Sequence, residues 1–544
     1  MRKYLLSAAA VIALTASGAI AHDESATLIE GLGDHQHTIA TSQEDAQRFF
    51  DQGLILTFAF NHAEAIRSFQ RAAELDPNSP MPLWGIAYAL GPNYNLPADP
   101  AQLKQAYETV QKALKLADKA PARERAYVEA LAARYSSDPN ADQKKLAEAF
   151  SARMKALSDA YPDDLDAATL YAESMMNLNP WNLWTKDGQP WDKTMEIVAV
   201  LERVLMRDPS HPGANHLYIH AVEASPHPEW ALAAAKRLET IAPASGHLVH
   251  MPSHIYMLVG DYKAAADANV IAAKVDKDYI DNEHVRGAYP MLYFHHNLHF
   301  IAAARGMEGR YGDAREAASR LIESLHSHGD DIPELRNFVT EYFGMYPLLT
   351  AVRFHDWKTV LAAKEPAEDL PISRGLRHYA RGLAFAATGS AKSAAAEREG
   401  LAKIAASLPI ESRYGNSPAK GVLNIGLAIV DARIAAQKGD LEKAVTDLEV
   451  AVATQDKLAY NEPADWHYPV RESLGAALLK VGRAAEAEAV FRADLRKNPR
   501  SGRSLFGLVE ALTAQGKTDE AMLVRQELND AWRTAEIEPT LDTM

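Results

Sequence analysis

The chain has 544 residues, a formal net charge of −15, 47% hydrophobic residues and no cysteine. The acidic balance argues against nucleic acid as a partner, because proteins bind the phosphate backbone through clustered Lys and Arg. The absence of cysteine excludes disulfides, thiolate metal sites and covalently attached c-type haem.

The N-terminus has the pattern of a secretory signal peptide, residues 1–21. Arg2 and Lys3 precede an apolar run over 4–20, and the run ends in Ala-Ile-Ala at 19–21. A cationic start, a short apolar stretch and small residues before the cleavage point are typical of a signal that is removed, and not of a membrane span. We therefore expect cleavage after Ala21 and a periplasmic or secreted mature protein without membrane insertion. Loss of the two cations changes the net charge from −15 to −17 (−15 − 2).

After an N-terminal segment, residues 22–45, the pattern is uniformly helical. The first predicted hairpin has Ala65, Phe69, Ala72 and Pro77 at the small, aromatic, small and terminating positions of a tetratricopeptide (TPR) unit. Alanine-rich helices continue to residue 535 without the alternation that strands require. The sequence thus predicts an all-α protein, a TPR-type α-solenoid in which helical hairpins stack into one right-handed superhelix over 46–535. Residues 536–544 are predicted to be a tail.

Glycine-containing turns separate the helices of the later hairpins. The turn glycines follow in the sequences VGDY, EGRY, KGDL, VGRA and QGKT: Gly260, Gly309, Gly439, Gly482 and Gly516. Glycine adopts the left-handed conformation that ends a helix without steric cost.

Three segments interrupt the repeat: residues 90–100, 177–191 and 456–473. The second concentrates three of the eight tryptophans of the chain. Long loops in a compact solenoid are typical of binding loops or lids. The alternative is that the tryptophans only close the end of a hydrophobic stack.

Histidines recur at the TPR period in the region 211–299, which holds 11 of the 20 histidines of the chain. His216 and His250 are 34 residues apart, and so are His220 and His254. A further i, i+4 pair, His295 and His299, follows in the next predicted hairpin. Because residues four apart lie on one side of a helix, each pair should present two imidazoles to the same surface.

This pattern favours a metal centre. In a TPR solenoid the first helix of each hairpin lines the concave groove, and we expect the histidines to point there. Protonated imidazoles would repel one another and unpaired buried ones would be costly, whereas shared metal ions resolve both problems. The predicted ligands are His216, His220, His247, His250, His254, His295, His296 and His299. Plain packing, or a groove that binds a peptide or an anion, are the alternatives.

Copper is the favoured ion, with zinc and iron as alternatives. Two ions held by three imidazoles each would resemble the di-copper sites of tyrosinases and haemocyanins, which have an unrelated fold. Imidazole also suits zinc and iron. Di-iron sites normally use more carboxylates, and the nearby ones are Glu223, Glu283 and Glu341. Glu223 is predicted to act as a catalytic base or to orient a ligand.

Three further histidines lie in the N-terminal segment. His35 and His37 precede the first hairpin and either fold back over the groove as further ligands or belong to a solvated segment. His22, at the predicted mature N-terminus, lies in a stretch that has the composition of a disordered tail.

Several blocks resemble a family of bacterial secreted TPR-repeat proteins: FNHAEAIRSFQRAAELDP, LWGIAYALGPNYN, HPGANHLYIHAVEASPHPE, GHLVHMPSHIY and YPVRESLGAALL. The resemblance covers nearly the whole mature chain and implies TPR architecture and export. It implies no reaction and no catalytic residue.

Together these features predict an exported solenoid with a histidine-rich metal centre, acting as a metal-dependent oxidoreductase on a small molecule or peptide in the concave groove. The alternatives are a non-catalytic scaffold that binds a peptide, a protein partner or a metal, and a zinc-dependent hydrolase. An enzyme should leave an open coordination position beside a pocket, whereas a scaffold or metal store should close it.

Overall fold

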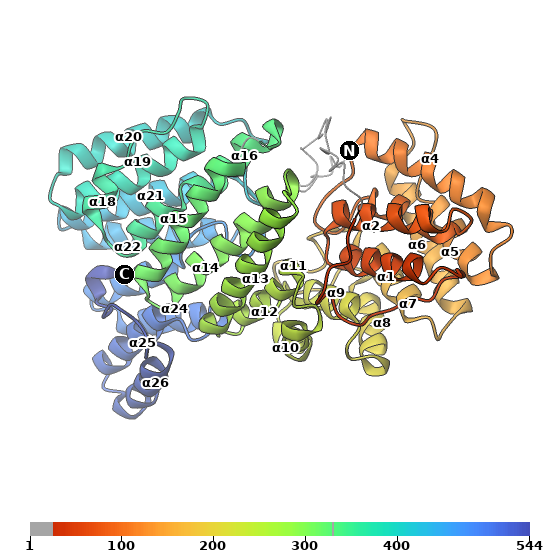
Figure 1. Ribbon diagram of the computed structural model, residues 1–544. Coiled ribbons are helices and arrows are strands. Elements are labelled where there is room, and N and C mark those ends of the chain that lie inside the picture. Colours follow the sequence, from red (N-terminus) through yellow and green to blue (C-terminus); the bar gives the residue numbers. More distant parts are fainter. Residues whose placement is uncertain (1–25, 329–330) are drawn as a thin grey trace. The chain divides into compact units, whose positions relative to one another are not determined.

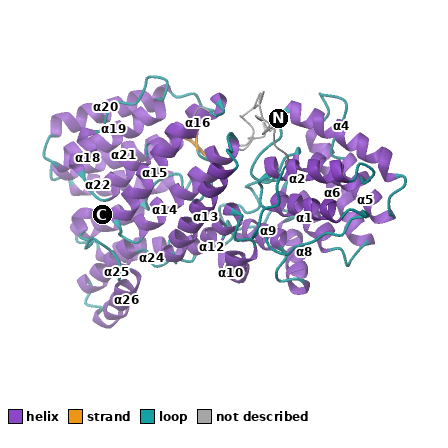
Figure 2. Cartoon of the chain, viewed as in Figure 1, coloured by secondary structure: helices purple, strands orange, loops and turns teal. Residues whose placement is uncertain are grey.

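The computed structural model describes residues 26–328 and 331–544, and in this part of the chain nearly all regular structure is helical (Figures 1 and 2). Its strands are β1 (Arg413–Tyr414) and β2 (Ser417–Pro418), which form a short antiparallel pair. The predicted signal peptide, residues 1–21, and His22 lie outside the described residues. None of the described helices combines the length and the apolar character that crossing a membrane requires.

The chain forms two compact units, residues 1–255 with 271–289, and residues 256–270 with 290–544. The first unit contains α1 (Glu44–Phe58), α2 (His62–Leu75), α3 (Pro80–Ala89), α4 (Pro100–Ala117), α5 (Ala122–Ala132), α6 (Gln143–Ala160), α7 (Leu165–Met176), α8 (Thr194–Arg207), α9 (Pro212–Val222), the 3₁₀ turn η2 (Pro228–Ala231), α10 (Leu232–Ile241) and α11 (Gly246–His250). The division passes through α12 (Pro252–Leu258) and α13 (Tyr262–Asn282).

The second unit takes in residues 256–270 of that region and resumes within the π-helical segment η3 (Tyr289–Phe294), followed by α14 (His295–Met307) and α15 (Tyr311–His328). It continues with α16 (Pro333–Gly344), α17 (Tyr346–Arg353), α18 (Trp357–Ala362), α19 (Pro371–Ala387), α20 (Ala391–Ser407), α21 (Ala419–Gln437), α22 (Leu441–Gln455), α23 (Val470–Lys480), α24 (Ala484–Lys497), α25 (Gly502–Ala514), α26 (Thr518–Ala531) and the 3₁₀ turn η4 (Leu541–Thr543).

Consecutive helices pack against each other as hairpins in both units, including α1 with α2, α14 with α15, α19 with α20 and α21 with α22. The first hairpin has the predicted positions: Ala65, Phe69 and Ala72 are all buried. This confirms the predicted fold class, all-α and built from TPR-type hairpins. The extent of one continuous solenoid over 46–535 stays a prediction.

A phenylalanine held between two glycines repeats at both ends of the chain and shows why these hairpins stack closely. A Cβ atom added at Gly53 or at Gly85 would lie 2.6 Å from the ring of Phe69. The ring of Phe491 is in the same relation to Gly475 and Gly507. In each case the glycines lie on the two helices that flank the aromatic one, so the ring contacts main chain on both sides.

The predicted turn glycines have the expected backbone. Gly260, Gly309, Gly439, Gly482 and Gly516 have φ values of 79°, 76°, 82°, 78° and 73°. These left-handed positions follow the first helix of each hairpin and allow the chain to reverse.

Candidate metal centre

The predicted ligands are divided between the two units. His216, His220, His247, His250 and His254 lie in the first unit together with Glu223, and His295, His296 and His299 lie in the second. Each set is therefore described within its own unit.

Helix α9 brings His216 and His220 into the interior of the first unit. Pro212 is at the start of the helix, where its fixed φ is favourable and its missing N–H is not needed. His211 is the N-cap, and its ring Nδ1 accepts a hydrogen bond from the Ala214 N–H. Every residue of α9 is buried, so its two polar rings one turn apart must find partners inside the protein.

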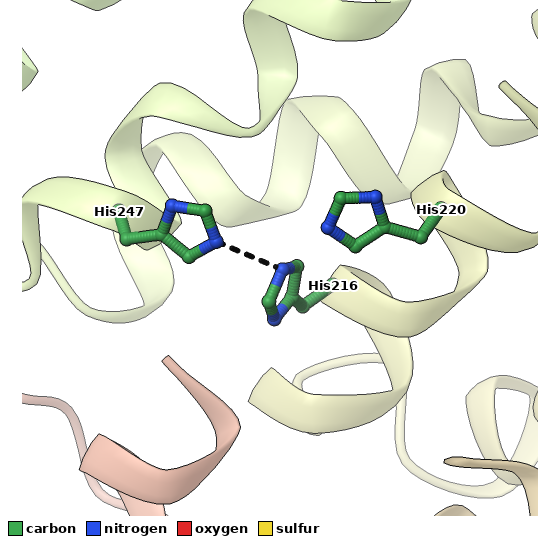
Figure 3. Close-up of side chains that lie close together, drawn as sticks. All are labelled: His216, His220 and His247. Atoms are coloured by element: carbon green, nitrogen blue, oxygen red, sulfur yellow. Dashed lines mark hydrogen bonds between the residues drawn. The ribbon is translucent and has the colours of Figure 1, made fainter. Parts of the chain in front are cut away.

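Three imidazoles converge at the centre of this set (Figure 3). The Nε2 atoms of His216 and His247 are 3.2 Å apart. One ligand atom of each of His216, His220 and His247 lies within 4.8 Å of the others. Tetrahedral coordination with bonds of about 2.0–2.1 Å places ligand nitrogens roughly 3.3 Å apart. The three side chains thus come close to the geometry that one ion needs.

The Nδ1 atoms of His216, His220 and the neighbouring His254 have acceptors as partners. The His216 Nδ1–H donates to the main-chain oxygen of Phe58 at 2.5 Å, and the His220 Nδ1–H donates to a carboxylate oxygen of Glu223 at 2.7 Å. The other carboxylate oxygen of Glu223 accepts from His254 Nδ1–H at 2.6 Å. Because the proton of each neutral ring is on Nδ1, the lone pair is on Nε2, which is the arrangement that metal-bound histidines have.

His220 is the most informative of these side chains. It is 2% exposed, and its Nε2 has no hydrogen-bond partner among the described residues. A buried polar atom without a partner is rare and costs about 1–3 kcal/mol. A metal ion is the partner that suits a bare imidazole lone pair.

Burial favours the neutral form of His216 and His247, whereas Glu223 stays ionised. Burial, followed by the neighbouring His220, lowers the pKa of His216 well below its usual value, and burial followed by His216 does the same to the pKa of His247. Burial alone would raise the pKa of Glu223, but the charges of His254 and His220 outweigh it and hold that pKa at about 2. Glu223 is therefore a carboxylate with both oxygens occupied, and this geometry favours the orienting role over the role of a base.

His250 and His254 form a second pair of rings beside Glu223. Their Nε2 atoms are 2.8 Å apart, which is a hydrogen-bond length and shorter than the roughly 3.3 Å of two ligands on one ion. In addition, α11 ends at His250 and α12 starts at Pro252. The expectation that this HxxxH pair lies on one continuous helix is therefore wrong.

Aromatic rings from three segments enclose the imidazoles. The ring of Phe60 is 4.5 Å from that of His216. Tyr94, from the predicted loop 90–100, and Trp181, from the loop 177–191, stack on each other and lie 5.2 and 5.9 Å from His220. Two of the three interrupting segments, 90–100 and 177–191, thus contact the histidine set.

Two of the enclosing residues have strained backbone. Phe60 and Trp181 have φ values of 57° and 60°, a left-handed conformation that non-glycine residues rarely adopt. Trp184 in the same loop donates its indole N–H to the Ala221 oxygen of α9 at 2.7 Å and so fixes the loop to that helix. Strain of this kind gathers at functional sites, where the surrounding structure maintains it.

The histidines of the second unit have different surroundings. His295 donates from Nδ1 to the Met291 oxygen at 2.9 Å, and its Nε2 is 2.9 Å from the Ser324 hydroxyl, so both nitrogens are used. His299 packs among Tyr342, Phe343 and Tyr346. His296 packs on the ring of Phe300. Their assignment as ligands stays a prediction.

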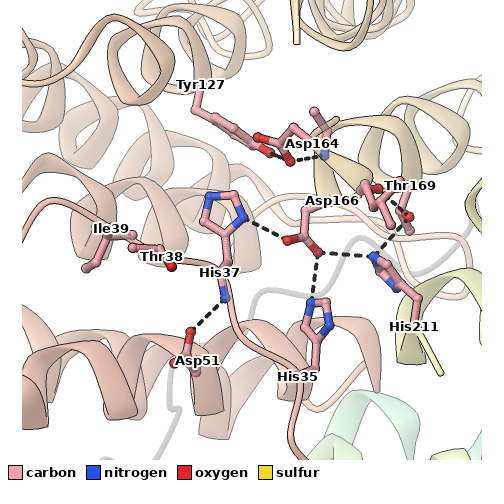
Figure 4. Close-up of polar contacts among 12 residues, drawn as sticks. His35, His37, Thr38, Ile39, Asp51, Tyr127, Asp164, Asp166, Thr169 and His211 are labelled. Atoms are coloured by element: carbon pink, nitrogen blue, oxygen red, sulfur yellow. Dashed lines mark hydrogen bonds and ion pairs between the residues drawn. The ribbon is translucent and has the colours of Figure 1, made fainter. Parts of the chain in front are cut away.

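A second histidine cluster lies in the first unit, and the sequence did not reveal its centre (Figure 4). The Asp166 carboxylate accepts from His35 Nε2 at 2.9 Å, from His37 Nδ1 at 2.7 Å and from His211 Nε2 at 3.2 Å. His37 is only 6% exposed, so the alternative of a solvated position does not hold for this residue. A lone aspartate on α7 gives no spacing signal, because its partners come from residues more than 40 positions away in the chain.

The neutral form of His211 is the opposite tautomer to that of the rings beside Glu223. Because its Nδ1 accepts from a backbone N–H, its neutral form carries the proton on Nε2 and donates it to Asp166. This ring has no free lone pair for an ion. The Asp166 cluster is therefore a hydrogen-bonded contact that attaches the N-terminal segment to the helices.

Comparisons with known proteins add little beyond this geometry. No family model matches the chain, and no curated protein matches it. Solved structures that align include the human IFIT1 dimer with m7Gppp-AAAA, at 14% identity over 92% of each chain with a TM-score of 0.32. Yeast Tom70 aligns at 13% identity over 90% of this chain and 92% of its own, with a TM-score of 0.28. The APC/C hetero-tetramer Cut9-Hcn1 aligns at 12% identity over 90% of each, with a TM-score of 0.29. At these TM-scores the alignments support no conclusion, and the fold assignment rests on the hairpins themselves.

Proposed function

We propose that this protein is a metal-binding helical-repeat protein, and that His216, His220 and His247 of the first unit hold one transition-metal ion through their Nε2 atoms. The observation that carries the proposal is the buried Nε2 of His220, a lone pair without a partner among the described residues, beside two further imidazole nitrogens. Glu223 and the Phe58 oxygen orient two of the rings. His254 and His250 complete the polar surroundings.

Copper is the favoured ion and zinc the alternative. Neutral imidazoles without thiolates suit either ion, and copper(II) binds nitrogen ligands more tightly than the other divalent metals of its row. The predicted export of the protein, which would keep it apart from cytosolic copper buffers, also favours copper.

A binding role fits this site better than catalysis. The three ligands are 0%, 2% and 3% exposed, and aromatic rings enclose them. The oxidoreductase or zinc hydrolase predicted from the sequence would need a coordination position open to substrate. We therefore propose a structural or storage ion, with a protein partner on the surface of the helical repeats as a further part of the function.

The test is metal analysis of the purified protein combined with titration of the stripped protein by Cu²⁺ and Zn²⁺. Wild type should bind one ion tightly, and His220→Ala should lose it while keeping its helical circular dichroism. His227→Ala is the matched control, because this exposed histidine of the same unit pairs with Glu229 and stacks on Trp230, away from the proposed ligands. Equal metal content in His220→Ala and wild type would refute the assignment.

A further inference from the structure

The second unit contains a cavity of about 410 Å³ that is separate from the histidine set. The first helices of successive hairpins line it, namely α17, α19, α21, α23 and α25, together with the turn η4 near the end of the chain. This volume lies within the range of small-molecule sites in proteins.

The cavity has an apolar wall and a cationic wall. Leu383, Ile429 and Trp357 supply apolar and aromatic surface. Three arginines supply the cationic wall: Arg353, Arg433 and Arg503.

Most of the charges around the cavity are matched. Arg353 forms a bidentate pair with Glu472, at 2.6 and 3.1 Å. Lys480 pairs with Asp542 at 2.7 Å. Arg433 donates to the main-chain oxygen of Met544 at 2.6 Å and is only partly buried, so solvent also stabilises its charge.

Arg503 is the exception. It is 3% exposed, and its Nη atoms donate only to the main-chain oxygens of Thr543 and Arg353, which are uncharged groups. Its Nε has no hydrogen-bond partner among the described residues, and none of the ion pairs found in them includes it. A buried guanidinium without a carboxylate is costly to desolvate.

Neighbouring positive charges contribute to the lowered pKa values of both Arg503 and His355. Burial, followed by the charge of Arg353, lowers the pKa of Arg503 to about 9. Burial, followed by the charges of Arg433, Arg503 and Arg353, lowers the pKa of His355 to about 3. His355 also lines the cavity and stacks on Trp357. An anion placed here would relieve the repulsion that both shifts reflect.

We propose that this cavity binds a small amphipathic anion, with Arg503 pairing with its carboxylate, phosphate or sulfonate group and Leu383, Ile429 and Trp357 contacting its apolar body. One unmatched guanidinium calls for one anionic group, and the apolar wall calls for a compact hydrocarbon or aromatic remainder. This binding site does not depend on the metal centre.

The competing explanation is that Arg503 only holds main chain in place. Its bonds to Thr543 and Arg353 would then be its whole purpose, and the cavity would have no preference for anions. The two explanations differ in what happens when the charge is removed and when the cavity is filled.

The experiment is a fluorescence titration of the full-length protein with anilinonaphthalene sulfonate, an amphipathic anion that brightens on binding. Wild type should show one saturable site. Arg503→Met should weaken binding at least about tenfold, because a bond to a charged group in a buried site contributes that much or more. Arg525→Met, the same substitution at a half-exposed arginine of the same unit, should leave binding unchanged.

Two further measurements keep the test decisive if Arg503→Met fails to fold. Ala386→Phe fills the cavity from α19 without changing any charge, and it should abolish binding. Phenylnaphthylamine, the uncharged counterpart of the probe, should bind wild type at least about tenfold more weakly. Absence of a saturable site, normal binding by folded Ala386→Phe, or equal affinity for the charged and uncharged probes would each overturn the proposal.

Discussion

The exchange Glu223→Gln tests the metal centre most directly, because one carboxylate serves two histidines. Its oxygens accept from His220 Nδ1–H at 2.7 Å and from His254 Nδ1–H at 2.6 Å. Glutamine has the same shape but offers one acceptor oxygen and one N–H₂ donor group. One of the two rings must then accept at Nδ1 and carry its proton on Nε2, which removes the lone pair that would bind an ion.

The expected loss of metal affinity follows from the contribution of side chains that hydrogen-bond to metal-bound histidines. Replacing a group that orients a metal-bound histidine weakens metal binding about 10–100-fold, which corresponds to about 1.4–2.7 kcal/mol. The fold should remain, because the amide still forms one of the two hydrogen bonds. The loss should be larger if the ring that changes is His220, since its Nε2 is in the proposed ligand set.

The assay is competition between stripped protein and a chromogenic chelator for Cu²⁺ and Zn²⁺, with circular dichroism as a check of the fold. Glu229→Gln is the matched control, because this glutamate pairs with the exposed His227 in the same unit. Unchanged affinity in a folded Glu223→Gln protein would show that its hydrogen bonds do not orient metal ligands and would refute the reasoning.

Four further predictions concern the ion, the Asp166 cluster and the packing of the first hairpin. Removing the ion should lower the melting temperature, since an ion at about 100 times its Kd stabilises the folded state by about 2.7 kcal/mol; calorimetry of stripped and loaded protein measures this. Asp166→Asn should destabilise the first unit by about 3–5 kcal/mol, because it leaves the buried rings of His37 and His211 and the partly buried ring of His35 without their carboxylate. Burial lowers the pKa of His35 and His37, but the bond to Asp166 and its charge outweigh burial and raise it. The ion pairs of these two histidines with Asp166 therefore stabilise the fold fully below about pH 6.5, and this stabilisation is lost as the pH rises through their raised pKa values. Proteolysis of the N-terminal segment should then be faster at high pH. Gly85→Ala should cost about 1–3 kcal/mol by forcing a methyl group against Phe69, as thermal unfolding will show.

Each of these substitutions has a control within the chain. Asp163→Asn changes an almost fully exposed carboxylate next to the same helix and should leave stability unchanged. Gly306→Ala adds a methyl group in α14 with nothing within 4 Å and should be neutral or stabilising. Equal effects of Asp166→Asn and Asp163→Asn, a steady cleavage rate across pH, or equal melting of Gly85→Ala and Gly306→Ala would contradict the respective argument.

The sequence by itself determined the helical architecture and much of the first histidine set. Phe69, the small residues around it and the turn glycines are local signals, because each TPR hairpin buries its face against its immediate neighbours in the chain. The 34-residue recurrence works in the same way: it singled out His216 and His220, and the structure then brings them close to His247.

Only the tertiary structure decided which ring nitrogen of His216 has a lone pair available for an ion. A tautomer depends on the partner of Nδ1: for His216 this is the distant Phe58 oxygen of α1, whereas for His211 it is the local N-cap contact with the Ala214 N–H. One arrangement leaves an Nε2 lone pair and the other removes it, although both residues lie in the same helical segment of the sequence. The Asp166 cluster and the unmatched charge of Arg503 were likewise invisible, because contacts between residues far apart in the chain leave no periodic trace.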